Sequence, residues 1–340
     1  MEKSRIAVIG AGAIGGITAA LMAEKGYDVW LVCKHMEIAD LANGRGLHVR
    51  GYCGEHTVPV HSVAAVELKD SFDLCMIATK AYDMPECAKA MLPLLREDSL
   101  VVSMQNGICT DALAAIVGKE RTVGCVIGWG ATMHGPGGRG MTSGGDFIIG
   151  RLVKGEHPRM EALRQALSAV VETRVSQDIY AELYSKLIVN SCITSLGAIC
   201  GLHLGEMLKR RRARDIFLAI IGEAMDVAHA MKLQVPPFGG KLDYEKLMHG
   251  DTPLDSLRRH VMIRLVGMKY SKLKSSSLQS LERGRPTEID YFNGYIARKG
   301  QELHVDCPVN QRLVTMIKEI EHHAREINVK NLEDPGLLVK

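Results

Sequence analysis

The sequence lacks the cysteine spacings that are typical of zinc sites and redox motifs. Its nine cysteines are scattered over 340 residues without a Cys-X-X-Cys pair, and several lie inside apolar runs such as FDLCMIATK. This pattern indicates reduced cysteines that serve as packing residues. His322 and His323 adjoin Glu321 near the end of the chain, but adjacent helical residues point in different directions, so the pattern does not favour a shared metal site.

A strong charge excess, internal repeats and low-complexity segments are also missing. The net charge of +3 is too small to indicate a nucleic-acid partner, and the basic run Lys209 to Arg214, KRRRAR, is more typical of the solvated face of a helix. No apolar run approaches the roughly 20 residues that span a bilayer. The opening MEKSRIAVIG enters a strand pattern without the apolar core of a signal peptide. We therefore expect a cytoplasmic protein without a membrane partner.

Length and patterning predict two domains. A chain of 340 residues exceeds the size at which single cores usually stop growing, and its 46% hydrophobic and 24% charged residues are ordinary for a globular protein. Strand and helix patterns alternate in the first half, which predicts an α/β doubly wound sheet. Helical patterns dominate from Asp178 onward. We place the boundary near Ser176, so that residues 1–176 form the α/β domain and residues 177–340 an all-α domain.

The first 34 residues carry a dinucleotide-binding pattern. The stretch RIAVIGAGAIGGITAALMAEKGYDVWLVCK reads as strand, glycine turn, helix and strand, and its glycines match G-x-G-x-x-G. The three glycines allow a sharp turn, close approach of phosphate and close helix packing, and the helix start offers free N–H groups to a pyrophosphate. We therefore expect the cofactor to contact Gly10, Gly12, Ala13, Ile14 and Gly15.

The end of the second strand favours NADP over NAD. An NAD site usually has an acidic residue here, which bonds the ribose hydroxyls, whereas this chain has Lys34 followed by His35. A cation attracts a 2′-phosphate that a carboxylate would repel. Glu37 and Asp40 follow within a turn, and Lys34 alone is also compatible with a solvated loop lysine.

Two further strand ends are polar. The predicted strands are HTVPVHSV, FDLCMIATK, SLVVSMQNG and RTVGCVIGWGATM, with a helix in AYDMPECAKAMLPLL. Ligands of such sheets bind at the carboxyl ends of strands, where this chain places Thr79 with Lys80, and Gln105 with Asn106 and Gly107. These residues are candidates for binding, although Asn-Gly is also a common turn pair. The glycine-dense stretch from His134 to Gly150 does not lead into a helix and predicts a hairpin connection.

A predicted helix of the second half, Ile179 to Cys200, carries an unexpected polar stripe. Its apolar residues recur at helical spacing, yet Lys186, Asn190 and Thr194 lie four residues apart and therefore on one side. Further helices are expected over 213–231, 255–274, 288–300 and 310–327. An ammonium group in an apolar helix is either a snorkelling lysine at a helix edge or part of a site. The stripe could face a cleft between the domains.

Motifs along nearly the whole chain resemble the ketopantoate reductase family. They are GAGAIGG, TKAYD, QNG, SKLIVNS, SSSLQSLERGRPTEIDYFNG and CPVN, in the family's order. The resemblance implies a Rossmann-like N-terminal domain followed by an all-α domain of the 6-phosphogluconate dehydrogenase-like type. It also implies NADPH-dependent reduction of 2-dehydropantoate, also called ketopantoate, to pantoate in pantothenate and coenzyme A biosynthesis.

The resemblance also implies roles for single residues. Lys186 matches the family's general acid, which protonates the keto oxygen, and Asn190 matches the amide that bonds the substrate hydroxyl. Asn106 would lie near nicotinamide and substrate, Ser276 would bind the substrate carboxylate, and Glu288 would be the site's carboxylate. Physical chemistry agrees, because hydride transfer to a ketone leaves negative charge on oxygen, which a nearby ammonium stabilises. A neighbouring carboxylate favours the charged form of that amine.

Three departures from the family pattern concern the substrate. Thr194 stands where the family has a second asparagine, Ser277 and Ser280 replace a methionine and an aspartate, and residues 236–274 form a longer segment than usual. A paralogue that reduces another branched 2-oxo acid is therefore an alternative, and so is a non-catalytic protein that senses NADP(H). Apolar helices in the second half make a homodimer plausible.

Overall fold

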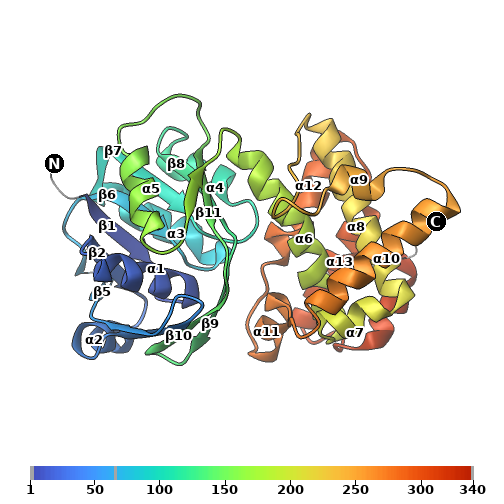
Figure 1. Ribbon diagram of the computed structural model, residues 1–340, viewed down its shortest axis with the longest axis horizontal. Coiled ribbons are helices and arrows are strands. Elements are labelled where there is room, and N and C mark those ends of the chain that lie inside the picture. The colour runs from blue at the N-terminus through green and yellow to red at the C-terminus, as the bar shows by residue number, and fades with distance from the viewer. Residues whose placement is uncertain (1–3, 65–66, 338–340) are drawn as a thin grey trace. The chain divides into compact units, whose positions relative to one another are not determined.

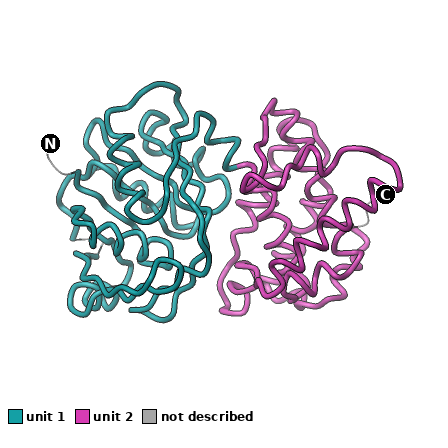
Figure 2. Tube along the Cα trace, viewed as in Figure 1, with its two compact units in different colours: residues 1–183 teal, residues 184–340 magenta. Residues whose placement is uncertain are grey.

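The chain divides into two compact units, residues 1–183 and 184–340 (Figure 2). The computed structural model describes residues 4–64 and 67–337 (Figure 1). Sequence patterns place the boundary at Ser176, whereas the division falls inside helix α6, Ile179–Cys200. The first turn of α6 belongs with unit 1 because Ile179 packs against Gly124 and Gly150, where an added Cβ would lie 2.8 and 2.7 Å from its side chain.

Unit 1 is built on an eight-stranded sheet with the order β12-β11-β8-β7-β6-β1-β2-β5. Six strands that are neighbours in the sheet run parallel to one another: β8, β7, β6, β1, β2 and β5. Strand β11 pairs antiparallel with β8. The strands are β1 (Arg5–Ile9), β2 (Asp28–Cys33), β5 (His61–Ala64), β6 (Phe72–Ile77), β7 (Leu95–Ser103), β8 (Thr122–Ile127), β11 (Phe147–Arg151) and β12 (Thr173–Val175).

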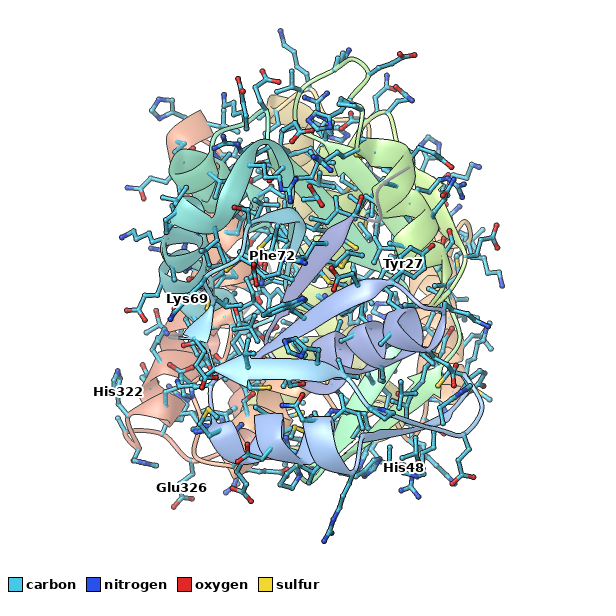
Figure 3. All side chains as sticks on the ribbon, turned by 90° about the vertical axis from the view of Figure 1, so that its left-hand side faces the viewer. Tyr27, His48, Lys69, Phe72, His322 and Glu326 are labelled. Atoms are coloured by element: carbon cyan, nitrogen blue, oxygen red, sulfur yellow. The ribbon has the colours of Figure 1, made fainter. Side chains whose placement is uncertain are left out.

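Helices cover both faces of this sheet. Contacts between α1 and α5 place these two together, while α3 and α4 pack on each other against β6, β7 and β8. The helices are α1 (Ala13–Glu24), α2 (Met36–Gly44), η2 (Ala81–Asp83), α3 (Met84–Met91), η3 (Leu92–Leu94), α4 (Thr110–Val117) and α5 (Met160–Ser168). The predicted doubly wound α/β domain is thus confirmed. Figure 3 looks onto this unit, with the fully buried Phe72 toward the centre and the partly exposed His48 at the rim.

A second, four-stranded sheet has the order β4-β3-β10-β9 and was not predicted. Its strands are β3 (Leu47–Gly51), β4 (His56–Val58), β9 (Gly130–His134) and β10 (Gly138–Ser143). Two predicted single strands are wrong, because HTVPVHSV breaks at Pro59 into β4 and β5, and RTVGCVIGWGATM divides into β8 and β9 of different sheets. The predicted hairpin is present as the antiparallel pair β9–β10. Helix α1 contacts strands of both sheets.

Unit 2 is helical, with one isolated bridge between Phe238 and Leu242 among its described residues. Its elements are most of α6, then α7 (Leu204–Lys209), α8 (Arg211–Ala230), α9 (Tyr244–Met248), α10 (Pro253–Lys269), α11 (Ser276–Glu282), η4 (Ile289–Tyr291), α12 (Asn293–Leu303), α13 (Pro308–Glu321), η5 (Val329–Glu333) and η6 (Pro335–Leu337). The basic run does not form one helix face, because Arg210 has extended backbone between α7 and α8. Arg214 then donates to the carbonyls of Leu208 and Lys209 at the end of α7.

Helix α6 is buried along most of its length. It has 22 residues and is apolar enough to cross a membrane, so the prediction that no segment approaches this length is wrong for α6. However, 83% of its most apolar stretch is buried inside the protein, as in a core helix.

All nine cysteines are free and seven are buried, in agreement with the predicted packing role.

Two polar clusters fix the carboxyl-terminal part of unit 2. Glu223 of α8 accepts hydrogen bonds from the backbone N–H groups of Val309 and Asn310 at the start of α13, and the Asn310 side chain in turn accepts from Asn293. Burial raises the pKa of Glu223. The asparagines of the FNG and CPVN motifs therefore bond each other, which gives both motifs a structural task.

The second cluster holds the end of the described chain. The Asp334 carboxylate accepts from Arg312 of α13 at 2.9 and 2.7 Å, and Arg325 lies 3.4 Å away. The Arg312 guanidinium lowers the pKa of Asp334 from its ordinary 3.8. A lowered pKa means that the ionised carboxylate stabilises the fold above its ordinary pKa, and that this contribution is lost as pH falls through the lowered value.

We expect Asp334→Asn to reduce the free energy of unfolding by about 2 kcal/mol at about pH 7, because the charged hydrogen bonds from Arg312 and the ion pair with Arg325 weaken. The difference from the wild type should shrink below the ordinary pKa of 3.8 as the wild-type carboxyl is itself protonated. Urea unfolding of both proteins at several pH values measures this, with the exposed Asp306→Asn as control. An equal loss at every pH would show that the charge of Asp334 is irrelevant.

Candidate active site

The glycine turn lies where the strand order of the large sheet reverses. Strand β1 stands between β2 and β6, and ligands of open α/β sheets bind at such a point. Gly10 has φ +105°, and a Cβ there would lie 3.0 Å from the backbone of Ala78 and Thr79 at the end of β6. A Cβ on Gly15 would lie 2.1 Å from the Gly10 carbonyl oxygen. The turn and the close packing predicted for these glycines are both present.

Gly12 differs from Gly10 and Gly15 because a Cβ on Gly12 would meet nothing within 4 Å. It is the N-cap of α1, with no side-chain cap and no acidic residue in the first turn. The first N–H groups of a helix have no partner within the helix, and the dipole there favours an anion. Gly12, Ala13 and Ile14 are all partly exposed. This open cradle fits the pyrophosphate of a dinucleotide.

A buried arginine supports the glycine turn from the second sheet. Arg139 of β10 is 0% exposed and donates to the carbonyls of Ala11 at 2.7 Å and Pro136 at 2.6 Å. Gly16 leaves room for it, because a Cβ there would lie 2.4 Å from Arg139 Nε. Burial lowers the pKa of Arg139, and no described carboxylate forms an ion pair with it. Sequence reasoning missed Arg139, whose segment showed only a hairpin pattern.

The predicted polar strand ends lie at the same edge of the sheet. Gln105 is buried and donates from Nε2 to the Ile77 carbonyl at 2.7 Å, while its Oε1 accepts from Ser103. Gln105 thus joins the ends of β6 and β7 and has a structural task. Asn106 follows, half-buried, before Gly107 with φ +84°, and Lys80 is exposed. Asn106 and Lys80 therefore both reach the surface at this edge.

Lys34 is exposed directly after β2, next to His35, which is the N-cap of α2. Glu37 and Asp40, which the sequence offered as possible opposing charges, are exposed on α2. The strand end therefore presents a cation to solvent, in the position where a dinucleotide's adenosine ribose lies in this class of sheet.

The polar stripe of α6 is present in unit 2. From Tyr184 to Cys200, every residue of α6 is buried except Lys186, Asn190 and Ile193, which are partly exposed. These three recur at helical spacing, so one narrow side of an otherwise buried helix reaches solvent. The predicted side-by-side placement of Lys186 and Asn190 thus agrees with the structure.

Three hydrogen bonds hold the helix around Lys186. Tyr184 donates to the Ala224 carbonyl at 2.8 Å, and Ser185 donates to the Pro236 carbonyl at 2.7 Å. Tyr244 is also buried and donates to the Ser185 carbonyl at 2.7 Å. The backbone immediately before Lys186 is therefore fixed by α8, by the following loop and by α9, which limits the positions that its ammonium can take.

Thr194 continues the stripe but is only 6% exposed. Its hydroxyl donates to the Asn190 carbonyl at 2.7 Å within the same helix. Because the hydroxyl proton is used in this way, Thr194 can accept a hydrogen bond from a ligand but does not donate one.

The backbone on either side of Glu288 is held by hydrogen bonds of the preceding residue, Thr287. Glu288 is itself 6% exposed and precedes η4. The adjoining Thr287 donates to Glu321 from both its backbone N–H, at 2.7 Å, and its hydroxyl, at 2.6 Å, and accepts from the N–H of Ile289. Sequence reasoning considered Glu321 only as a metal candidate and missed this anchoring role, since the pattern of one sequence does not show which segments meet.

The serine motif places Ser276 at the first position of α11, where it is exposed. Ser275 caps the helix by accepting from the N–H of Leu278. Ser277 and Ser280 of the same motif are buried. Over residues 4–64 and 67–337, no group of three or more His, Cys, Asp or Glu residues is arranged to hold a metal.

Comparisons with known proteins agree over both units. Two family models match, one described as "Ketopantoate reductase PanE/ApbA" over residues 6–154 and one as "Ketopantoate reductase PanE/ApbA C terminal" over residues 178–321. A 2-dehydropantoate 2-reductase of Archaeoglobus fulgidus is 28% identical, over 94% of this chain and 99% of its own.

Two solved structures share the fold over 94% of this chain and 99% of their own. One is a PanE/ApbA family ketopantoate reductase from Ralstonia eutropha, at 25% identity and a TM-score of 0.80. The other is a D-mandelate dehydrogenase with NADH and anilino(oxo)acetate, at 24% identity and a TM-score of 0.80.

Gly12 and Gly15 should respond differently to replacement by alanine. Gly15→Ala forces a Cβ against the Gly10 carbonyl and should lower the free energy of unfolding by about 3 kcal/mol. Gly12→Ala adds its Cβ in open space at φ −68°, so stability should change by less than about 1 kcal/mol. Denaturant unfolding measures both. Equal losses would contradict the geometry of the turn.

Proposed function

The chain belongs to the ketopantoate reductase family, and on that premise we propose that it reduces 2-dehydropantoate to pantoate with NADPH. One observation carries the proposal: Lys186 and Asn190 lie one helical turn apart and are partly exposed, on a stretch of α6 that is otherwise largely buried in unit 2. The reaction would serve pantothenate and coenzyme A biosynthesis. Nine free cysteines support a cytoplasmic location.

Lys186 acts on the keto oxygen of the substrate. A reduced nicotinamide, when bound, supplies the hydride that the ketone accepts. Negative charge then develops on the keto oxygen, and the Lys186 ammonium stabilises it and delivers a proton. The bonds of Tyr184, Ser185 and Tyr244 hold the backbone of this turn of α6 in place, which supports the preorganised position that electrostatic stabilisation requires of Lys186.

The remaining side chains bind and orient the acid. Asn190, one helical turn from Lys186, hydrogen-bonds the substrate hydroxyl, and Ser276 hydrogen-bonds the carboxylate. Glu288, whose neighbour Thr287 is anchored to Glu321, favours the charged form of the ammonium. Asn106 of unit 1 contacts nicotinamide and substrate.

The cofactor is held by unit 1. Gly10, Gly12, Ala13, Ile14 and Gly15 surround the pyrophosphate, and the open space at Gly12 supports this assignment. Arg139 places a buried positive charge behind the same turn. Lys34, after β2, binds the 2′-phosphate that distinguishes NADP from NAD, and Lys80 follows β6 on the other side of β1.

A second candidate substrate follows from Thr194. Ketopantoate carries a hydroxyl that can donate to the Thr194 oxygen, whereas the family's asparagine would offer a longer amide. The shorter side chain also leaves space for a branched 2-oxo acid without a hydroxyl. A D-mandelate dehydrogenase shares the fold, so the fold alone does not determine the acid.

Oxidation of NADPH with a matched pair of acids tests the proposal. Ketopantoate and 3-methyl-2-oxobutanoate differ by one hydroxymethyl group, and we expect kcat/KM to favour ketopantoate at least about 100-fold, because buried polar groups reject an analogue that lacks the hydroxyl. A higher kcat/KM for 3-methyl-2-oxobutanoate would instead support the second candidate substrate, a branched 2-oxo acid without a hydroxyl. Cofactor binding without turnover of either acid would instead favour a non-catalytic sensor of NADP(H).

Lys186→Ala should reduce kcat about 1,000-fold, because both charge stabilisation and proton delivery are lost. The variant's NADPH affinity and thermal midpoint should match the wild type. Lys241→Ala, at an exposed lysine of the same unit, is the control. Wild-type turnover in Lys186→Ala would exclude Lys186 as the acid.

Lys34→Ala should weaken NADPH binding about 30-fold through loss of a charged contact, while leaving NADH binding unchanged. Titration of each cofactor against protein fluorescence measures this difference. Lys25→Ala, at the C-terminal end of α1 and away from the glycine turn, is the matched control. Equal effects of Lys34→Ala on both cofactors would rule out recognition of the 2′-phosphate.

A further inference from the structure

Helix α10 exposes an apolar stripe on the outside of unit 2. It is an orange helix in Figure 1 and spans Pro253–Lys269. One face packs on α7 and α8, where Ile263 and Gly267 are buried. The opposite face carries large side chains that are exposed to 76, 60, 48, 56 and 63%: Leu254, Leu257, Val261, Leu265 and Met268.

These five residues form one continuous stripe. Each follows the last by three or four positions, which places all of them on the side of the helix opposite Ile263. Stripes with this spacing are the seams through which helices pair. Single exposed apolar residues are ordinary on protein surfaces, but a contiguous row of them usually marks an interaction site.

The arginines of α10 are turned away from the stripe. Arg258 donates to the His249 carbonyl at 2.7 Å, and Arg259 donates to the Met248 carbonyl at 2.9 Å. Both thereby bind the loop between α9 and α10. Arg264 donates to the Lys209 carbonyl at 3.5 Å. Their guanidinium groups are engaged by their own unit and do not cover the apolar side chains.

The stripe is complementary to itself. Its spacing reads the same from either end about Val261, so an antiparallel copy brings Leu254 opposite Met268, Leu257 opposite Leu265, and Val261 opposite Val261. A two-fold axis produces this arrangement, in which the same patch serves both partners.

Charge also favours the antiparallel direction. Asp251 and Asp255 lie at the start of α10, and Lys269 and Lys272 lie at its end. Arg258 also lies near the start and pairs with Asp255 at 3.7 Å, so the two ends differ chiefly in the lysines. Antiparallel copies keep the lysine-bearing ends apart and oppose the helix dipoles, whereas parallel copies place those ends together. Tyr270 and Leu273, exposed to 48 and 39%, extend the apolar surface beyond the helix.

We infer that a second copy of this chain covers the stripe, through antiparallel pairing of the two α10 helices about Val261. The interface is independent of the proposed reaction, because no residue of the stripe is placed among those that bind cofactor or substrate. A failure of the reductase assay and a failure of the dimer can therefore be told apart.

Cysteine cross-linking tests the register of the pair. With a short bis-maleimide, Val261→Cys should form covalent dimers because residue 261 faces itself, whereas Leu257→Cys and Leu265→Cys alone should not. An equimolar mixture of those two variants should cross-link, since 257 faces 265. The wild type, whose nine cysteines are buried or half-buried, is the background control.

Sedimentation equilibrium tests the association itself. The wild type should be a dimer, and Leu257→Asp should weaken its association about 100-fold. Leu303→Asp, at an exposed leucine of α12, should leave the dimer unchanged. Cross-linking of all three single cysteine variants would overturn the antiparallel arrangement. A monomeric wild type would overturn the inference, as would a monomer that binds phosphatidylglycerol vesicles in a Leu257-dependent manner, because the stripe would then be a lipid-binding face.

Discussion

The burial of α6 is the constraint on which the site depends. A helix enclosed on nearly every side can expose only a narrow strip, and this strip consists of Lys186, Asn190 and Ile193. Bonds from Tyr184, Ser185 and Tyr244 fix the helix at that point. The strip thus places a partly exposed lysine on an otherwise buried helix, and a charged group in such a half-buried position is typical of those that work on a substrate.

Much of the fold and of the site follows from local patterns in the sequence. The glycine turn was predictable because each of Gly10 and Gly15 has a steric task that only glycine fulfils, and the structure shows both tasks. The limits of α6 were predictable from its apolar spacing. The stripe of Lys186 and Asn190 follows from the helix period alone.

Features that depend on distant segments were not predictable. The second sheet joins strands from residues 47–58 with strands from residues 130–143, and nothing in either stretch specifies the other. Pro59 and the Gly128–Trp129 bend divide runs that looked like single strands. Arg139, Thr287 and Glu321 act through partners far away in the sequence. The outer stripe of α10 is likewise visible only once the inner face is known to be Ile263 and Gly267.

The bond from Arg139 to the Ala11 carbonyl also bears on how unit 1 is made. Its two ends are separated by 128 residues, so the first turn of the chain cannot reach its final form until β10 has left the ribosome. Contacts of such long range are slow to form, because a large loop must close first. Synthesis of unit 1 therefore passes through a stage in which the glycine turn is present without its buried cation, and β10 later completes a site that β1 began.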